Sequence, residues 1–376
     1  MGEKLLLIPG PTNLSKRVRE VMAGPQLAHV GSEFYGTFKD ILQLSRYALK
    51  NEKGFQFVFT GTGTTGMESS VVSLVSHGDR TLTLETGYFG KRMLLLNQIH
   101  RAKADSIAYP DGRHADPEDL RKKLKKTKYK VVFITHVDTA TSIVNPIREL
   151  VAECAKAGVI SVVDSVCGVG GEELDFDKLG ADIVFTASQK ALAGAPGAVI
   201  LAVSNEALRY MEGRKEPIES YYMSLLRWKP IMDDPRMYLA TPAIQVLLAL
   251  REALREVKEE SIEARWIRHH KLGESTRQKV SEMGLRFVAD EGFRADTVTS
   301  FWVEEGKAGG IQKTLNEKYD IMVSRGIYEA RDKMIRIGHF GILTVDQLRQ
   351  ALAALDSVLV ESGVAGRSNV QLAKRK

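Results

Sequence analysis

The lysine of the segment Ser188-Gln189-Lys190 is the residue of this sequence with the clearest chemical potential. It follows an apolar run at 181–186 that reads as a buried strand, and it precedes a glycine-rich segment at 194–197. Ammonium groups are rarely buried without a partner, so a lysine in this place needs an explanation. Lysine amines form Schiff bases with carbonyl compounds, which would give Lys190 a catalytic role. A lysine that ends a loop with its amino group in water is the alternative.

A glycine-rich turn, Gly61-Thr62-Gly63-Thr64-Thr65-Gly66, follows another apolar run and opens a helical pattern. Its spacing matches the GxGxxG pattern of dinucleotide-binding sites, and Glu85 ends the next strand, where an acidic residue would bind a ribose. NAD binding is therefore one interpretation. A glycine-rich turn before a helix also offers N–H groups and hydroxyls to any phosphate, including the phosphate of pyridoxal phosphate.

Further residues favour pyridoxal phosphate over NAD. Asp164 ends the β-branched run at 159–163, where a carboxylate could keep a pyridine nitrogen protonated. Tyr88 or Phe89 follows another strand end and could stack on a flat ring, and Thr139 could donate a hydrogen bond to the phenolic oxygen of that ring. Each residue also has an ordinary interpretation, as a turn former, a core aromatic residue or a loop threonine. Together with the lysine they describe one site.

The elements that must position these residues alternate between strands and helices. Apolar runs predict buried strands at 55–60, 80–85, 130–135, 159–164, 183–186 and 198–203. Helical periodicity predicts helices at 67–76, 91–98, 116–124 and 147–157. This alternation indicates an α/β fold with a mostly parallel sheet. Ligands of such sheets bind beyond the carboxyl ends of the strands, which is where the candidate residues lie.

The second half of the chain predicts a smaller α+β domain. A long helical stretch at 243–283 contains the expected domain boundary. Beyond it we expect strands at 285–289, 298–303 and 334–337, and helices at 310–319 and 344–360. The predicted organisation is an N-terminal segment at 1–14, a large cofactor-binding domain at 15–255, a small domain at 256–362 and a mobile basic tail at 363–376.

The composition argues against several classes of function. The 376 residues are 44% hydrophobic and 27% charged, which is ordinary for a globular chain with a large core. No window approaches the roughly 18 apolar residues of a membrane span, and the first apolar run is too short for a secretory signal, so we expect a cytoplasmic protein without a membrane partner. Much of the net charge of +6 lies at 121–130 without interleaved aromatic residues, so we expect no nucleic-acid partner. Cys154, Cys167 and the pair His269-His270 match no metal-ligand spacing, so we expect no metal site.

At these motifs the chain resembles the class V aminotransferases, the serine:pyruvate and alanine:glyoxylate aminotransferases, among the fold-type I pyridoxal phosphate enzymes. The resemblance covers nearly the whole chain and rests on six motifs: Pro9-Gly10-Pro11-Thr12, Gly61-Thr62-Gly63-Thr64, Val163-Asp164-Ser165, Ser188-Gln189-Lys190-Ala191-Leu192, Tyr238-Leu239-Ala240-Thr241-Pro242 and Ile335-Arg336-Ile337-Gly338-His339. It implies a large domain with a mostly parallel, seven-stranded-type sheet between helices, and a smaller α+β C-terminal domain.

The resemblance also implies how pyridoxal 5'-phosphate is held. Lys190 would bind it as an internal aldimine and act as the general base and acid, Asp164 would pair with the ring nitrogen, Phe89 would stack on the ring and Thr139 would contact its phenolic oxygen. The phosphate would be held by Thr62, Gly63, Thr64 and Gln189, and by Tyr238 and Thr241 of a neighbouring subunit. The active sites would therefore lie at the interface of a homodimer.

For the substrate, the resemblance implies a carboxylate bound by Arg336 next to a turn that includes Pro9, Gly10 and Thr12. The implied reaction is a ping-pong transamination from alanine or serine to glyoxylate or pyruvate. Arg325 and Arg331 are candidates for binding a second carboxylate, although a surface position is the alternative for each. The remaining alternatives are an enzyme of the 2-aminoethylphosphonate type or another class V aminotransferase, an NAD-dependent dehydrogenase, and a non-catalytic binding protein with this fold.

Two positions depart from the family pattern. Phe89 stands where many members carry a tryptophan, which keeps the stacking surface but removes an N–H donor. The loop at 136–142 carries Asp138 and ends in Ser142 instead of a glutamate-bearing version that ends in glycine. Because a serine adopts a positive φ angle only reluctantly, this departure bears on the conformation of the loop and on the substrate range.

Overall fold

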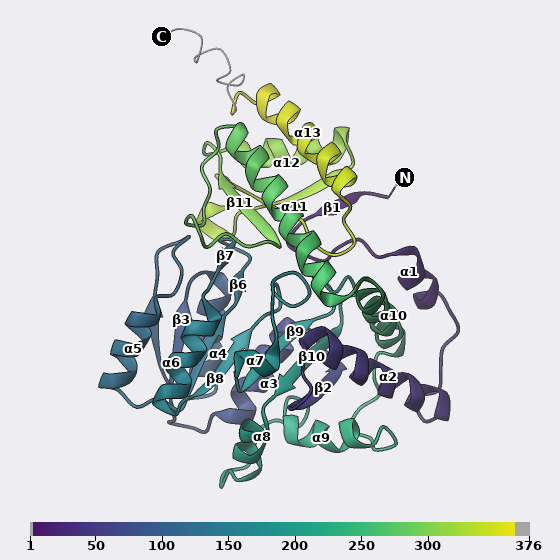
Figure 1. Ribbon diagram of the computed structural model, residues 1–376, viewed down its shortest axis with the longest axis vertical. Coiled ribbons are helices and arrows are strands. Elements are labelled where there is room, and N and C mark those ends of the chain that lie inside the picture. The colour runs from purple at the N-terminus through teal and green to yellow at the C-terminus, as the bar shows by residue number, and fades with distance from the viewer. Residues whose placement is uncertain (1–2, 365–376) are drawn as a thin grey trace.

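The protein is described here by a computed structural model that covers residues 3–364. Its centre is a seven-stranded sheet with the strand order β2-β10-β9-β8-β5-β3-β4, and a four-stranded sheet with the order β1-β12-β13-β11 lies above it in Figure 1. A short antiparallel ribbon of β6 (Val137–Asp138) and β7 (Ile143–Val144) lies between the two. The predicted α/β fold with a mostly parallel sheet is confirmed.

The large sheet consists of β2 (Phe55–Thr60), β3 (Arg80–Glu85), β4 (Lys103–Ala108), β5 (Val131–Thr135), β8 (Ile160–Asp164), β9 (Ile183–Ala187) and β10 (Ala198–Val203). All neighbours pair parallel except β10, which is antiparallel to β2 and β9. Every residue of β5, β9 and β10 is buried, as expected where helices cover both faces of a sheet. The sequence missed only β4, an edge strand in which no residue is fully buried.

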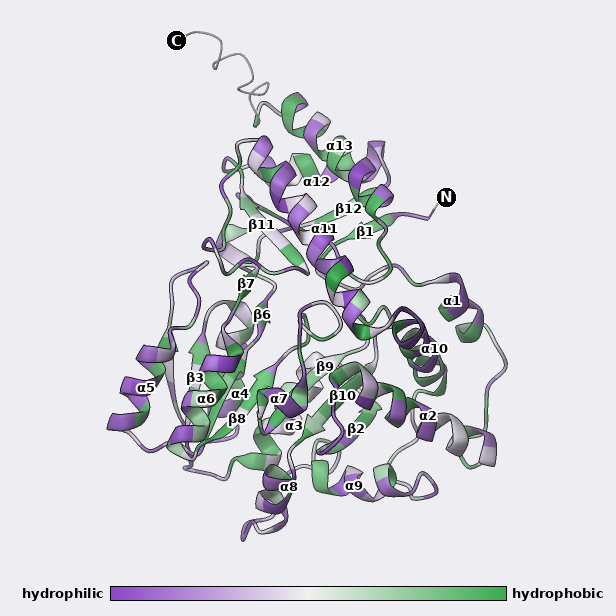
Figure 2. Cartoon of the chain, in the orientation of Figure 1, coloured by the Kyte–Doolittle hydropathy of each residue, from purple (hydrophilic) through white to green (hydrophobic). Residues whose placement is uncertain are grey.

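Within residues 3–364, the helices that share a hydrophobic cluster with the large sheet are α2 (Ser32–Leu49), α3 (Gly63–Leu74), α4 (Tyr88–Ile99), α5 (Pro117–Lys126), α6 (Ile147–Ala157), α7 (Phe176–Leu179), α8 (Asn205–Glu212), α9 (Leu225–Asp233) and α10 (Ile244–Glu260). Strands and helices share one hydrophobic cluster around Phe57, Phe133 and Phe185. Figure 2 shows the apolar strands enclosed by helices with polar outer faces, most clearly at α5. Within residues 3–364, every helix is too short or too polar to cross a membrane.

The smaller sheet consists of β1 (Leu5–Leu7), β11 (Val298–Trp302), β12 (Ile321–Arg325) and β13 (Met334–Gly338). It packs with α11 (Ile262–Glu282), α12 (Lys307–Lys318) and α13 (Val345–Glu361) around a second hydrophobic cluster, and a 3-10 turn, η1 (Tyr328–Ala330), precedes β13. The predicted division into domains stays a prediction. The long helical stretch breaks at Ser261, which has a φ of 67°. The tail that we expect to be mobile lies, from residue 365 onward, outside the described residues.

The predicted strand at 285–289 is wrong. Phe287 alone forms a bridge there, to Phe301 of the neighbouring sheet, and the chain then reaches the loop after β4, where the N–H of Asp290 donates to the carbonyl of Gly112 at 2.9 Å. The strand β12 was missed, because only two of its five residues are buried and its apolar run is correspondingly short.

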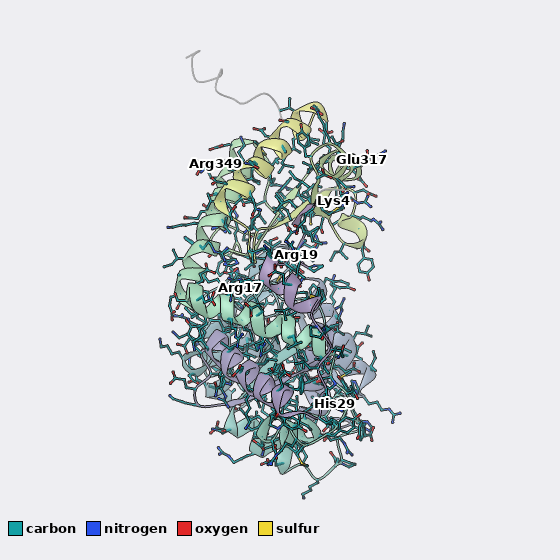
Figure 3. All side chains as sticks on the ribbon, turned by 90° about the vertical axis from the view of Figure 1, so that its right-hand side faces the viewer. Lys4, Arg17, Arg19, His29, Glu317 and Arg349 are labelled. Carbon is teal, nitrogen blue, oxygen red and sulfur yellow. The ribbon has the colours of Figure 1, made fainter. Side chains whose placement is uncertain are left out.

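The N-terminal segment connects the two sheets. Its strand β1 pairs parallel with β12, and the helix α1 (Lys16–Met22) packs against α10, where Arg17 pairs with Glu252 and Glu259. Figure 3 shows this side of the molecule, with Arg17 and Arg19 between the two halves. The turn between β1 and α1 therefore passes the region where the halves meet.

Candidate active site

A cavity of about 220 Å³ lies at the carboxyl ends of the central strands. Eight of the residues predicted from the sequence line it: Thr62, Gly63, Thr64, Phe89, Thr139, Asp164, Gln189 and Lys190. Residues that the sequence did not single out complete the wall: Met67, Arg92, Val137, Val166 and Cys167. Because these residues come from five separate segments, the fold and not the sequence order assembles the site.

The amine of Lys190 lies in this cavity against the N-terminal turn. Its Nζ donates a hydrogen bond to the carbonyl oxygen of Pro9, and the N–H of Thr12 donates to the carbonyl of Gln189 at 3.3 Å. Gly10 approaches so closely that a Cβ atom on this residue would lie 2.6 Å from Nζ of Lys190. The three turn residues expected at the substrate site therefore lie beside the lysine, although they do not line the cavity itself.

Asp164 ends β8 and is buried, with its Oδ1 accepting the N–H of Val166 at 3.1 Å. Burial, together with the nearby carboxylate of Asp138, raises the pKa of Asp164 to about 7, although the hydrogen bond from the N–H of Val166 and the charges of Arg92 and Lys190 oppose the shift. A protonated ring nitrogen next to this carboxyl group would favour its ionised form. The pair of Asp164 and a pyridinium therefore fits the chemistry of the cavity.

The start of α3 provides donors for a phosphate group. The side chain of Thr65 accepts the N–H of Thr62 at 2.9 Å, which fixes the entry into the helix. The N–H groups of the first turn have no partner inside a helix, and this end carries partial positive charge. A Cβ atom on Gly63 would lie 2.9 Å from the side chain of Val166, so the loop passes close to the wall. Gln189 also lines the cavity, and its buried Oε1 has no hydrogen-bond partner among the described residues. Because this oxygen is an acceptor, a hydrogen bond from Gln189 to a phosphate would come from its Nε2.

Phe89 and Arg92 form one wall of the cavity. The N–H of Phe89 donates to Asp138 at 3.0 Å, and the guanidinium of Arg92 lies 4.8 Å from the ring centroids of both Phe89 and Tyr88. Arg92 also donates to the hydroxyls of Thr64 at 3.0 Å and Tyr88 at 3.1 Å. Its position three residues after Phe89, on the same helix face, was the signal that could have found it.

Arg336 lies on β13 at the edge of the site. Its Nε donates to the carbonyl of Arg325 at 2.8 Å and its Nη1 to the carbonyl of Thr139 at 2.9 Å. Its Nη2 makes no hydrogen bond within residues 3–364. Burial lowers the pKa of this guanidinium, and the carboxylate of Asp138 opposes the shift. The side chain is thus fixed next to a residue that lines the cavity, with one donor atom left for a ligand.

The loop at 136–142 holds Ser142 at a positive φ angle, which a serine adopts only reluctantly. Ser142 has a φ of 62°, in the left-handed region, and its N–H donates to the carbonyl of Asp138 at 2.7 Å. Its hydroxyl bonds to that of Ser300. The carboxylate of the buried Asp138 accepts the N–H groups of Phe89 and Ala140. Hydrogen bonds on both sides therefore hold Ser142 where a glycine would meet less strain.

Other residues singled out from the sequence lie away from the cavity. Tyr238 and Thr241 are exposed on the loop before α10, where their hydroxyls are 3.1 Å apart. Arg331 is exposed, and Arg325 pairs with Asp332 at 2.9 Å. Glu85 ends β3 and does not line the cavity, so the ribose contact required by the NAD interpretation is missing.

No group of three or more potential metal ligands comes together in the part of the chain that the structure describes. Both cysteines are buried and free: Cys154 lies in the main core, and Cys167 contributes to the wall of the cavity. The two thiols therefore lie in different parts of the interior and do not form a disulfide.

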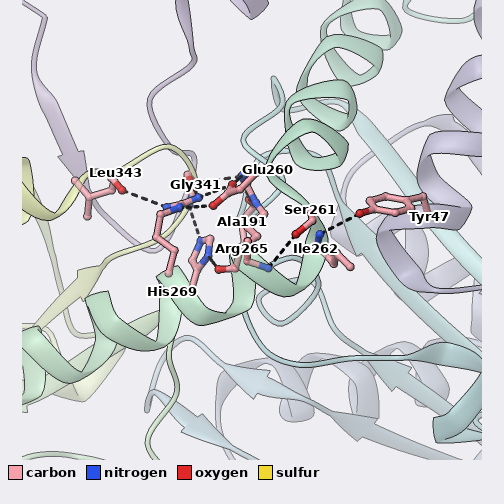
Figure 4. Close-up of polar contacts among 11 residues, drawn as sticks. Tyr47, Ala191, Glu260, Ser261, Ile262, Arg265, His269, Gly341 and Leu343 are labelled. Atoms are coloured by element: carbon pink, nitrogen blue, oxygen red, sulfur yellow. Dashed lines mark hydrogen bonds and ion pairs between the residues drawn. The ribbon is translucent and has the colours of Figure 1, made fainter.

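The backbone after Lys190 is supported by a buried ion-pair network, shown in Figure 4. Arg265 on α11 donates from Nε to the carbonyl of Ala191 at 3.1 Å and pairs with Glu260 at 2.6 Å. Arg268 pairs with the same glutamate and donates to the carbonyl of Gly341 at 2.9 Å. The network therefore connects the lysine segment to the end of α10 and to the loop before α13.

Comparison with known proteins finds aminotransferases that match nearly the whole chain. The sequence profile of the family "Aminotransferase class-V" matches residues 18–344. An uncharacterized aminotransferase of Methanocaldococcus jannaschii is 32% identical over 99% of this chain and 97% of its own. The serine–glyoxylate aminotransferase of Methylorubrum extorquens is 29% identical, covering 96% of this chain and 92% of its own. The crystal structure of alanine–glyoxylate aminotransferase from Nostoc superposes with a TM-score of 0.91 at 28% identity, covering 96% of both chains.

Proposed function

Because this chain belongs to the class-V aminotransferase family and is a pyridoxal phosphate-dependent aminotransferase, we propose that it transfers the amino group of alanine or serine to glyoxylate or pyruvate. The observation that carries the proposal is the meeting of Lys190, Asp164 and the α3 phosphate loop in one cavity. The names of the Methylorubrum and Nostoc relatives support small donors and glyoxylate as an acceptor.

The positions of the residues support the following roles. When bound, pyridoxal phosphate supplies an electron-accepting ring for the transfer of an amino group. Asp164 holds the proton of the ring nitrogen, and Lys190 accepts and returns the proton at Cα of the amino acid through its Nζ. Arg336 binds the substrate carboxylate with its free Nη2, which orients the Cα–H bond toward the lysine.

The residues around the cofactor divide between its ring and its phosphate. Phe89 would stack on the ring, and Thr139 would contact the phenolic oxygen. The phosphate would be held by Thr62, Gly63, Thr64 and Gln189. The turn that includes Pro9, Gly10 and Thr12 limits the space available to the substrate next to Lys190. The cytoplasmic location expected from the sequence stays a prediction.

We also propose that the enzyme works as a homodimer with active sites at the subunit interface. Tyr238 and Thr241 are exposed and do not line the cavity of their own chain, so they are available to bind the phosphate in a second copy. Sedimentation equilibrium of the holoenzyme tests the dimer. Mixing a Lys190→Ala variant with a Tyr238→Phe/Thr241→Ala variant tests the shared site, because mixed dimers would regain one intact site.

The central assignment is tested by the absorbance spectrum of the purified protein, followed by borohydride reduction and peptide mapping. We expect a visible cofactor band and a reduced pyridoxyl group on Lys190. A protein without this band after incubation with the cofactor, or a label on another lysine, would contradict the assignment.

The substrate class is tested by half-reactions with alanine, serine, glutamate, aspartate and 2-aminoethylphosphonate, each followed by the change of the cofactor band. We expect the fastest reactions with alanine or serine, because Arg336 provides a single carboxylate site. Rapid turnover of glutamate or 2-aminoethylphosphonate, with none of alanine or serine, would refute the proposed donors.

A further inference from the structure

Arg92 lies on the wall between two cavities. It lines the cavity that contains Lys190, and it also lines a neighbouring cavity of about 310 Å³, together with Tyr88, Lys91 and Tyr328. Its side chain is partly buried, on the first turns of α4. A cation in this position can influence whatever binds in the first cavity.

The contacts of Arg92 connect the aromatic wall to the phosphate loop. One nitrogen, Nη1, donates to the hydroxyl of Thr64 at 3.0 Å, and Nη2 donates to the hydroxyl of Tyr88 at 3.1 Å. The rings of Tyr88 and Phe89 lie on the guanidinium, each with its centroid 4.8 Å away. The side chain is therefore fixed by two hydroxyls and two rings, none of which neutralises its charge.

No carboxylate among residues 3–364 pairs with Arg92 within 4.0 Å, whereas Arg80, Arg121 and Arg148 each pair with a carboxylate. Thr64, to which Nη1 points, is the second residue of α3, where unpaired N–H groups and the helix dipole also favour an anion. Two sources of positive potential thus meet at the same end of the cavity. A guanidinium matches the geometry of phosphate oxygens better than an ammonium does.

We propose that Arg92 is a phosphate-binding residue of this enzyme, whose Nη1 contributes a charged donor to the cofactor phosphate beside Thr64 and the first turn of α3. The proposal rests on the assignment of the cavity to pyridoxal phosphate. The competing role for Arg92 is to bind a substrate anion in the second cavity. Its Nη1, however, donates to Thr64 of the phosphate loop, which does not line that cavity.

The test compares pyridoxal phosphate with pyridoxal, which has the same ring and aldehyde but no phosphate. Apoprotein is titrated with each compound, and dissociation constants are obtained from the absorbance of the bound form. For Arg92→Gln we expect a loss of pyridoxal phosphate affinity of about 10- to 100-fold, with pyridoxal affinity changed less than about 3-fold. Lys91→Gln is the matched control, because Lys91 lines only the second cavity, and it should change neither affinity.

The possible outcomes separate the assignments. An equal loss of both affinities would mean that Arg92 acts by positioning Phe89, and would overturn the proposal. Unchanged affinities in Arg92→Gln would overturn it as well. Arg92→Lys should recover part of the preference for the phosphorylated compound, because the charge remains but the forked geometry is lost. If the parent protein binds neither compound, the proposed function fails together with this assignment.

Discussion

A methyl group added at Gly10 would test whether the N-terminal turn positions Lys190, the lysine that we propose is catalytic. A Cβ atom at this residue would lie 2.6 Å from both Cδ and Nζ of Lys190 and 2.9 Å from its Cε. The lysine side chain is flexible, so Gly10→Ala relieves the overlap by moving the amine and not by unfolding the chain. Because a displacement of about 1 Å can cost on the order of 100-fold in rate, we expect kcat to fall by about that factor.

The same substitution also strains the backbone, because Gly10 has a φ of 93°. Alanine at a positive φ costs about 1–2 kcal/mol of the free energy of unfolding. Gly292→Ala is the matched control: Gly292 has a φ of 83°, and no atom lies within 4 Å of the position of its added Cβ. Both variants should lose similar stability, and only Gly10→Ala should lose activity.

The assay measures kcat and KM for the amino donor together with urea unfolding at a fixed cofactor concentration. Reduction with borohydride then shows how much cofactor remains attached to Lys190. If Gly10→Ala kept kcat within about 2-fold of the parent while losing the stability that Gly292→Ala loses, the turn would have no part in placing the amine. The close contact would then be a packing feature only.

Three further predictions concern charged groups. The pKa of Asp164 is about 7 in the folded protein but about 4 when unfolded, so the folded state binds more protons between these values and stability falls as pH rises. The free energy of unfolding of the cofactor-free protein is measured with urea from pH 5 to pH 8. Over this range Asp164→Asn should gain up to about 3 kcal/mol of stability relative to the parent, because the parent loses the contribution of the protonated Asp164. Parallel pH profiles of the two proteins would contradict the raised pKa. Glu260→Gln leaves the buried Arg265 without its ion pair and should lower the free energy of unfolding in urea by about 3 kcal/mol. The control Glu263→Gln, in an exposed pair with Lys50, should lower it by less than about 1 kcal/mol. Equal losses would refute the role of the ion-pair network. Arg336→Ala should raise KM for the donor and lower kcat/KM by at least about 100-fold, and an unchanged kcat/KM would remove it from the substrate site.

The sequence predicted the large sheet well, because its strands are buried on both faces and appear as continuous apolar runs. It failed where this signal was weak. The edge strand β4 has no fully buried residue, and β12 is short, whereas 285–289 is apolar but leaves the sheet after one bridge. Burial and pairing at the edges depend on neighbours that the local sequence does not specify.

Most of the eight predicted residues of the cavity follow a strand and carry a polar group or a ring, whereas Gly63 was predicted from the glycine spacing of its turn. Arg92 was not predicted, because an arginine inside a helix is usually on the surface and only its spacing of three residues from Phe89 pointed to the cavity. The coupling of Arg265 to Ala191 was equally hidden, because the two residues are distant in the chain and meet only in the folded protein. What sequence patterns miss here is the contact between elements, not the chemistry of single residues.

The position of β1 has a consequence for the order in which the protein matures. Leu5 pairs with Ile321, so the N-terminal turn cannot take its place against Lys190 until the ribosome has delivered most of the chain. Loop closure over such a separation is slow compared with local helix and hairpin formation. The large sheet can thus be complete while the amine still lacks the carbonyl of Pro9. A nascent chain that stalls before β12 would hold a nearly finished cavity without the turn that lies against Lys190.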